Sequence, residues 1–203
     1  MPVSSDKHNY SSDELQAVLA SAGDNVSVNR SVQMFSPHLI HLGSNVRIDC
    51  FSLLSAGQEG IYIGDHVHLA AGVYLFGSGG RIVVESFCNL SSRVAVYTAS
   101  DDYTEGYLTN PTVPMKFRKV LQGHVILRRH AIVGTGSILL PGVTLGVAAS
   151  VGALTLVHKP VGDFAVVAGI PFRVVGERNR RILEGEKELL EEEAPRGSDE
   201  ASR

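Results

Sequence analysis

The sequence predicts an all-β solenoid, a coil of short parallel strands with three flat sides. The first observation is a six-residue period of apolar residues at Leu127, Val133, Leu139, Leu145, Val151 and Val157. Four places after the first five of these stand small or β-branched residues, namely Ala131, Ser137, Val143, Ala149 and Thr155. The same period recurs in shifted frames, for example at Leu42, Ile48 and Leu54. A period of six is neither helical nor simply alternating, so it indicates one inward apolar residue on each flat side and a small residue at each corner.

Three such sides make one turn of about eighteen residues, and successive turns stack as parallel strands about 4.8 Å apart. Stacking buries a continuous apolar column that no single turn could bury alone. The periodic segments 42–97 and 125–157 predict about five turns, to which residues 26–41 can add part of another. We expect the whole solenoid domain to span residues 26–175.

An N-terminal helical segment is expected within residues 1–25. Ser11 and Glu14 form a capping box, in which each side chain bonds the backbone amide of the other residue. Leu15, Val18 and Leu19 follow on one apolar face, and the helix is expected to end near Gly23.

A second helix is expected at the C-terminal end, over residues 176–193. Its apolar residues Ile182, Leu183, Leu189 and Leu190 share one face. Residues 194–203 are polar and contain Pro195 and Gly197, so this tail is expected to be disordered.

The six-residue period fails between Val96 and Val125. Residues 98–121 include two prolines and the aromatic residues Tyr103, Tyr107 and Phe117. Insertions at the corners of a solenoid often form the binding face, so this segment is predicted to be the active-site loop. The alternative is a variable surface loop without a function.

Composition and charge exclude several classes of protein. The 203 residues are 44% apolar and 19% charged, which is typical of a globular protein. A net charge of −3 argues against a nucleic-acid-binding protein. No stretch approaches the ~20 apolar residues of a membrane helix, and the N-terminus lacks a signal-peptide pattern. We therefore expect a cytoplasmic protein that binds neither nucleic acid nor membrane.

The repeat resembles that of the hexapeptide-repeat acyltransferases, and the match covers roughly residues 26–175. This resemblance implies a left-handed parallel β-helix of hexapeptide repeats with a short N-terminal helix and a C-terminal helix. It also implies a homotrimer with an active site between neighbouring prisms, and acetyl-CoA or another acyl-CoA as cosubstrate without a metal.

One departure from the family's pattern bears on the chemistry. In sugar O-acetyltransferases of this fold, a Thr-Gly-His or Ala-Gly-His stretch supplies the general base. The matching stretch here is Tyr97-Thr98-Ala99-Ser100-Asp101, so aspartate stands where the histidine would be. Imidazole suits the activation of a hydroxyl, whereas a carboxylate with a pKa near ~4 is a poor base for it. A neutral amine is already nucleophilic, so Asp101 favours N-acylation.

Three further stretches resemble one branch of the family. They are residues 89–93, residues 100–102 and the C-terminal sequence AGIPFRVV. That branch contains the N-acyltransferases of nucleotide-linked 4-amino-4,6-dideoxy sugars. The resemblance implies a nucleotide-linked amino sugar as substrate and a role in surface polysaccharide synthesis, such as that of O-antigen lipopolysaccharide, or in the synthesis of other glycans.

The resemblance also implies candidate catalytic and substrate-binding residues. Asp101 would orient the amine or accept its proton, and Asp102 could exchange roles with it. Ser91 or Ser92 would bond the sugar or relay a proton. Arg93 would meet the nucleotide phosphates, and Tyr97 and Tyr103 complete the substrate-binding set. The alternatives are that the aspartates cap a turn, the serines fill a corner and Arg93 is a solvated surface residue.

The C-terminal motif implies a coenzyme A site. Ala153 would lie along the pantetheine arm, where a small side chain allows close approach, and Thr135 would bond that arm. Lys159 and Arg173 match basic residues that meet the phosphates of the coenzyme. The alternative for Lys159 and Arg173 is a solvated surface.

Three rival functions remain at this stage. Sugar O-acetylation by the same fold is the first, and a non-catalytic scaffold subunit is the second. The third is a zinc hydratase or hydrolase, which would need three converging neutral imidazoles. The γ-class carbonic anhydrases share this fold and bind zinc with three histidines. The spacings of His66, His68, His124 and His130 do not match the histidine pattern of that family. His130 is expected to be exposed beside Arg129.

Overall fold

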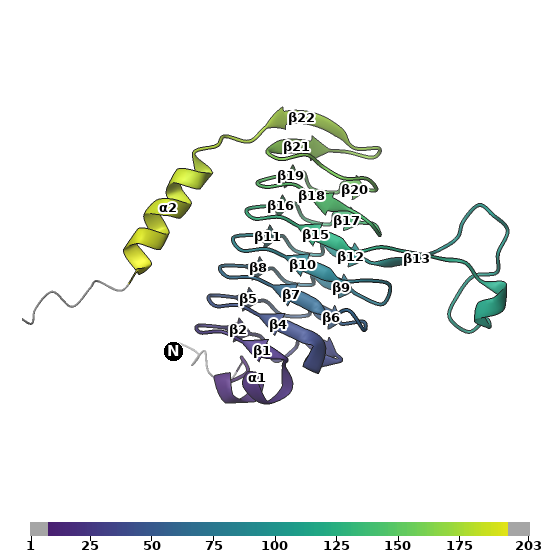
Figure 1. Cartoon of the computed structure of the whole chain (residues 1–203), viewed down its shortest axis with the longest axis horizontal. Coiled ribbons are helices and arrows are strands. Elements are labelled where there is room, and N and C mark those ends of the chain that lie inside the picture. The colour runs from purple at the N-terminus through teal and green to yellow at the C-terminus, as the bar shows by residue number, and fades with distance from the viewer. Residues whose placement is uncertain (1–7, 195–203) are drawn as a thin grey trace, which may run out of the picture.

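A computed structural model describes residues 8–194 as a three-sided prism of parallel strands (Figure 1). The first face contains β1 (Ser21–Ala22), β4 (Ile40–Leu42), β7 (Ile61–Ile63), β10 (Ile82–Val84), β15 (Val125–Leu127) and β18 (Thr144–Leu145). The second contains β2 (Ser27–Val28), β5 (Arg47–Ile48), β8 (His68–Leu69), β11 (Asn89–Leu90), β16 (Ile132–Val133), β19 (Ser150–Val151), β21 (Ala165–Ala168) and the antiparallel β22 (Arg173–Glu177). The third contains β3 (Gln33–Phe35), β6 (Leu53–Ser55), β9 (Tyr74–Phe76), β12 (Ala95–Tyr97), β17 (Ile138–Leu139) and β20 (Leu156–Val157).

The apolar period forms the inside of the prism, as predicted. The inward residues of the second face, for example, are Ile48, Leu69, Leu90, Val133 and Val151, and each is at most 4% exposed. Their neighbours in register belong to strands one turn apart, so each turn buries its apolar side chains against the next.

The prism has about seven turns rather than the predicted five. The additional turns lie at both ends, because the solenoid starts at Ser21 and its last parallel strand is β21. Ala22, Val28, Met34 and Ile40 continue the six-residue period at the N-terminal end. Alanine and methionine fill inward positions there, so the period is weaker than in the other turns, where leucine, isoleucine and valine recur.

The two helices are shorter than predicted. The helix α1 (Ser12–Val18) begins with the predicted capping box, in which Glu14 Oε2 lies 2.7 Å from the amide of Ser11. It ends before Gly23 because the chain turns into β1, which pairs with β4. The helix α2 (Ile182–Glu193) starts after residues 173–177, which pair with β21 instead. Most of the predicted disordered tail, residues 195–203, lies outside the described residues. No helix within residues 8–194 is long and apolar enough to cross a membrane.

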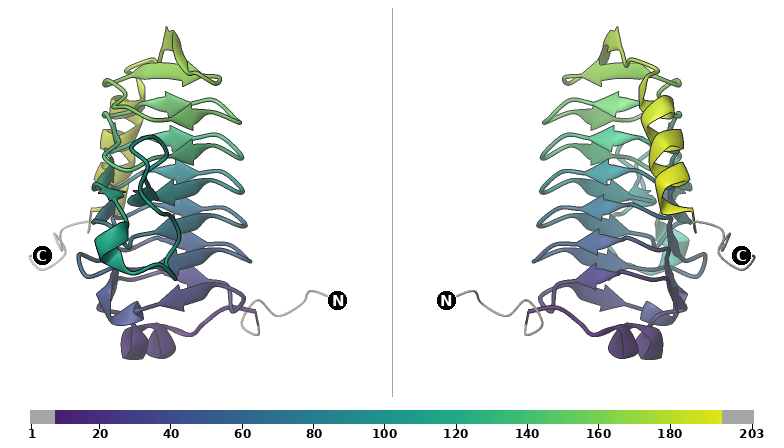
Figure 2. Two further views of the ribbon diagram at one scale, coloured as in Figure 1. Left: turned by 90° about the vertical axis from the view of Figure 1, so that its right-hand side faces the viewer. Right: turned by 90° about the vertical axis from the view of Figure 1, so that its left-hand side faces the viewer.

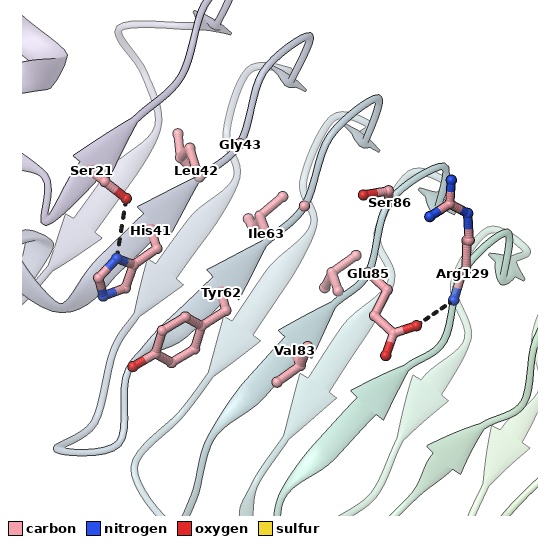
Figure 3. Close-up of a pocket in the computed structure, with 12 residues that line it drawn as sticks. Ser21, His41, Leu42, Gly43, Tyr62, Ile63, Val83, Glu85, Ser86 and Arg129 are labelled. Atoms are coloured by element: carbon pink, nitrogen blue, oxygen red, sulfur yellow. Dashed lines mark hydrogen bonds between the residues drawn. The ribbon is translucent and has the colours of Figure 1, made fainter. Parts of the chain in front are cut away.

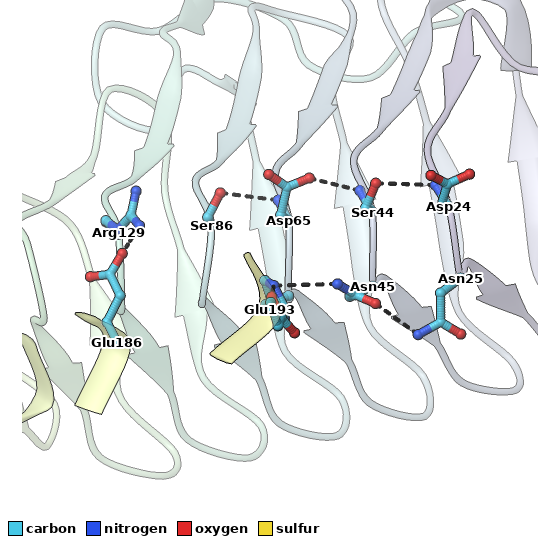
Figure 4. Close-up of polar contacts among 10 residues, drawn as sticks. Asp24, Asn25, Ser44, Asn45, Asp65, Ser86, Arg129, Glu186 and Glu193 are labelled. Atoms are coloured by element: carbon cyan, nitrogen blue, oxygen red, sulfur yellow. Dashed lines mark hydrogen bonds and ion pairs between the residues drawn. The ribbon is translucent and has the colours of Figure 1, made fainter. Parts of the chain in front are cut away.

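One edge of the prism, between the first and second faces, has left-handed backbone at every turn. Asn25, Asn45, His66, Phe87 and His130 all have φ between 53° and 64°. This conformation is unfavourable for residues other than glycine and asparagine. A ladder of contacts compensates for it. Asn25 donates to Asn45 over 2.7 Å (Figure 4). The rings of His66 and Phe87 stack 4.7 Å apart, and those of Phe87 and His130 stack 5.1 Å apart.

The helix α2 lies along this same edge (Figure 2, right; Figure 4). Glu186 contacts both Arg129 and His130, with 2.6 Å between its carboxylate and the His130 Nε2 atom. Glu193 lies 3.2 Å from His66, two turns lower. The prediction that His130 is exposed is wrong, because the helix leaves it only 4% exposed. Burial and the charges of Arg129 and Arg178 lower the pKa of His130, so a neutral ring can donate to Glu186.

Candidate active site

The segment predicted to be the active-site loop is an arm that projects from the edge between the third and first faces (Figures 1 and 2). Its base is an antiparallel hairpin of β13 (Ala99–Asp101) and β14 (Val120–Gln122), with Asp101 opposite Val120. The arm is exposed in the single chain, and Tyr103 is 89% exposed. The pairing of β13 with β14 places Asp101 where the arm leaves the prism.

Two donors fix the carboxylate of Asp101. The backbone amide of Asn110 lies 3.0 Å from Oδ2, and the Arg118 Nη2 atom lies 3.0 Å from Oδ1. The hydrogen bond from Asn110 and then that from Arg118 lower the pKa of Asp101 below its ordinary value. The carboxylate is therefore ionised at neutral pH and is a hydrogen-bond acceptor.

Asp102 is held differently from its neighbour. It is 6% exposed, and its carboxylate accepts from the amides of Thr104 over 3.4 Å and Glu105 over 2.7 Å. This is the turn-capping arrangement that the sequence analysis gave as an alternative. In this conformation the side chain of Asp102 stabilises the arm, whereas Asp101 contributes to a cavity beside the base of the arm.

A cavity of about 460 Å³ lies between the base of the arm and the third face. Three of the predicted residues, Tyr97, Asp101 and Tyr103, contribute to it. Ala99 and Ser100 of the arm also line it, as do the apolar residues Ile138, Leu140 and Leu156 on the side of the third face. These apolar residues, and Arg118 behind Asp101, were not among the predicted site residues. The six-residue period could have indicated Ile138, Leu140 and Leu156. They occupy outward positions, which are normally polar, so apolar residues there indicate a covered surface.

Ser91, Ser92 and Arg93 lie at a different edge, between the second and third faces. The amide of Ser91 donates to Val133 over 2.9 Å, and the carbonyl of Ser92 accepts from Gly136 over 3.0 Å. Arg93 is exposed and has a φ of 60°. The strand β12 lies between this edge and Asp101 (Figure 1), so one protomer does not bring Ser91 and Asp101 together.

Two residues of the predicted coenzyme site continue along the edge of Ser92. Gly136 bonds to Ser92, and in the next turn the amide of Leu154 donates to Thr135 over 2.9 Å. Thr135 and Ala153 are both exposed. The turns approach so closely that a Cβ atom on Gly134 would lie 2.5 Å from the Ala153 nitrogen. Ser92, Thr135 and Ala153 therefore form a row of small side chains along this edge, next to the larger exposed side chains of Arg93 and Leu154.

The predicted basic residues lie near the end of that line. The amide of Gly169 donates to the Thr155 hydroxyl over 3.1 Å, which fixes the last loop against the turn below. The Lys159 ammonium lies 5.3 Å from the centre of the Phe172 ring, next to Arg173. Lys159 and Arg173 are exposed, so both can meet an anionic ligand.

The histidines named in the zinc alternative point to separate partners. His68 contacts Asp49 at 2.8 Å, His124 lies 3.6 Å from Glu59, and His130 contacts Glu186. Within residues 8–194, no group of three metal-ligating side chains converges.

A second cavity of about 460 Å³ lies over the outer side of the first face (Figure 3). It holds Ser21, whose hydroxyl lies 3.1 Å from the His41 Nδ1 atom, and the His41 ring stacks on Tyr62 at 4.6 Å. None of the predicted site residues contributes to this cavity.

Comparison with known proteins identifies the family. A dTDP-4-amino-4,6-dideoxy-D-glucose acyltransferase from Escherichia coli is 37% identical over 164 residues, which cover 81% of this chain and 85% of that protein. The chain belongs to this family of acyltransferases. No protein-family model matches the chain.

Solved structures agree with this family. AntD, an N-acyltransferase from Bacillus cereus solved with dTDP and 3-hydroxybutyryl-CoA, is 37% identical to this acyltransferase, with a TM-score of 0.86 over 92% of this chain and 98% of that one. A maltose O-acetyltransferase from Clostridium difficile, 20% identical with a TM-score of 0.55 over 83% of this chain and 74% of that one, shows the fold alone. The predicted left-handed β-helix acyltransferase fold is confirmed, and the scaffold and zinc-enzyme alternatives are wrong.

Proposed function

We propose that this acyltransferase moves an acyl group from acyl-CoA to the amino group of a nucleotide-linked amino-deoxy sugar. The observation that carries the proposal is the ionised Asp101 beside a cavity, in the place where O-acylating relatives have histidine. The amine nitrogen attacks the thioester carbonyl carbon, the carbon–sulfur bond breaks, and the proton lost by the nitrogen ends on the thiolate, so that coenzyme A leaves as the free thiol. The low pKa of Asp101 makes its carboxylate a weak base. The carboxylate therefore accepts a hydrogen bond from the amine and orients the amine, and it does not retain the amine proton.

The solved structures of AntD support Ser91 and Asp101 as the acting pair. They include variants of one aspartate and variants of one serine ten positions before it, some of them with dTDP-4-amino-4,6-dideoxyglucose and coenzyme A. Ser91 and Asp101 are separated by the same number of positions. A dTDP-linked 4-amino-4,6-dideoxy sugar is therefore the substrate that we propose, in the cytoplasmic synthesis of a surface polysaccharide such as O-antigen.

A homotrimer would bring the two halves of this site together. Ser91 and the proposed coenzyme edge, which consists of Ser92, Thr135 and Ala153, flank one side of the third face, and Asp101 flanks the other. The outward residues of the third face are mostly apolar and include Leu53, Tyr74, Ala95, Ile138 and Leu156, with Gln33 and Ser55 as polar exceptions. The second face instead presents mostly polar residues, namely Ser27, Arg47, His68, Asn89 and Ser150, together with the apolar Ile132 and Val166. We propose that the third face packs against neighbouring protomers, whose coenzyme edges complete each site.

The acceptor is tested by measuring free coenzyme A release with two matched sugars. We expect release with acetyl-CoA or a longer acyl-CoA and dTDP-4-amino-4,6-dideoxyglucose, and release slower by at least about 100-fold with the 4-hydroxyl analogue, because a carboxylate does not activate an alcohol. Equal rates with both sugars would instead favour O-acylation, and the mass of each product would identify the acylated atom.

Lys159 should contribute to coenzyme binding. Replacing it with methionine keeps the apolar stem near Phe172 but removes the charge, so we expect the KM for acyl-CoA to rise about 10-fold with kcat nearly unchanged. The matched control is Lys187→Met on the exposed face of α2, which should leave the KM unchanged. A fall in kcat with an unchanged KM would contradict a role in binding phosphates.

A further inference from the structure

We infer that Arg118 is the residue that positions Asp101 for acyl transfer. This inference rests on the proposed function, because it assumes that Asp101 orients the amine. Arg118 lies at the other base of the arm, just before β14, and its Nη2 atom lies 3.0 Å from the Asp101 Oδ1 atom. The hydrogen bond joins the two strands of the arm at the point where Asp101 meets the cavity.

The environment of Arg118 argues against a purely structural ion pair. Its side chain is only 12% exposed, and its Nη1 atom has the Met115 sulfur as a weak acceptor at 3.8 Å. Its Nε atom is buried without a partner among the described residues. A buried donor without an acceptor lowers the stability of the fold. An arginine with an unpaired Nε atom is therefore poorly explained by stabilisation of the arm alone.

The other charged groups of the arm are already engaged. Lys119 pairs with Glu105, and the carboxylate of Asp102 accepts from two amides of its own turn. Lys116 lies over the Phe117 ring. Within the described residues, Arg118 is therefore the cation that acts on Asp101, and the Asn110 amide supplies the second contact.

Two donors to two different oxygens restrict the rotation of a carboxylate. With Oδ1 bound to Arg118 and Oδ2 bound to Asn110, the remaining lone pairs of Asp101 have fixed directions. An amine that donates to one of them is therefore held in one orientation before it meets the thioester. Arg118 touches Asp101 rather than the reacting atoms, so it is a positioning residue.

A double-mutant cycle with Asp101→Asn and Arg118→Gln tests this inference in the full chain. We expect Arg118→Gln to lower kcat by about 10-fold or more, and Arg118→Lys to recover part of the loss. If Arg118 acts through Asp101, the double variant should be no slower than Asp101→Asn alone. The control Lys116→Gln, in the same arm, should behave as the parent enzyme does.

A carbon-13 NMR titration of the Asp101 carboxyl provides a second readout that does not depend on turnover. The pKa of Asp101 should rise in Arg118→Gln and stay low in Lys116→Gln, because only the first change removes a donor. The inference would be overturned if the rate losses of Asp101→Asn and Arg118→Gln multiplied in the double variant. An unchanged pKa of Asp101 in Arg118→Gln would overturn it as well. If Asp101→Asn alone kept full activity, the proposed role of Asp101 would be wrong instead.

Discussion

Asp101→Asn should lower kcat for transfer to the amino sugar by about 100-fold or more, because it removes the negative acceptor that orients the amine. The substitution keeps the size of the side chain and a carbonyl oxygen for Arg118 or the Asn110 amide, so the arm should remain folded. Free coenzyme A release at saturating sugar and acyl-CoA measures the effect. The KM for acyl-CoA should change little, since the edge proposed to bind coenzyme A lies on the other side of the third face.

Asp102→Asn is the matched control for this prediction. The Asp102 carboxylate caps the turn at Thr104 and Glu105, so its loss should lower the free energy of unfolding by about 1 kcal/mol. The kcat of the folded enzyme should be nearly unchanged. If Asp102→Asn abolished turnover and Asp101→Asn kept it, the two aspartates would have the opposite roles.

Ile138→Lys should separate the protomers and remove nearly all activity. Ile138 lies on the outer side of the third face and is 38% exposed in the single chain. A lysine at the centre of the proposed interface would be buried without a partner, which costs several kcal/mol at each contact. Analytical ultracentrifugation should show monomers, and coenzyme A release should fall by more than about 100-fold at the same concentration.

The control for this interface is Ile132→Lys on the second face. It makes the same chemical change at an outward position one strand earlier, where the surrounding residues are polar. The oligomer and its activity should persist. A trimer that survives Ile138→Lys but not Ile132→Lys would place the interface on the second face.

Mixed oligomers test whether two protomers share one site. Ser91→Ala and Asp101→Asn chains should each be weakly active alone. Coexpressed in equal amounts, they should recover about one quarter of the parent activity, because one site in four then pairs an intact Ser91 with an intact Asp101 from its neighbour. No recovery would mean that both residues serve the same site from one chain.

The sequence predicts the prism well because each apolar residue of the six-residue period is a buried, inward-facing residue. Each inward position needs an apolar side chain, so residues such as Leu90 and Val133 recur at fixed spacing along the chain. The end turns were missed where Ala22 and Met34 occupy those positions. The helix boundaries were misplaced because residues 173–177 satisfy their backbone by pairing with β21, a tertiary contact that local propensity does not reveal.

The candidate site was only partly predictable from the chain. Asp101 stood out because a known pattern has histidine there, and the structure places Asp101 beside a cavity with Tyr97 and Tyr103. Arg118 could not be found this way, since its contact with Asp101 depends on the pairing of β13 with β14 across an aperiodic segment. Asp101 and Asp102 have different hydrogen-bond partners because the backbone turns where β13 ends. Two adjacent aspartates in the sequence give no indication of this difference.

The contacts of α2 along the prism have a consequence for how the molecule comes apart. A solenoid usually frays from its ends, because each terminal coil has only one neighbour. Here the last coil leads into a strap that reaches back to Arg129, His130 and His66, so the top cannot peel away while those carboxylate contacts hold. At the other end α1 covers the first coil with Leu15 and Leu19, but within residues 8–194 no comparable strap runs along the prism from there. Proteases should therefore cut the prism first at its N-terminal end, and the C-terminal coils should persist longest.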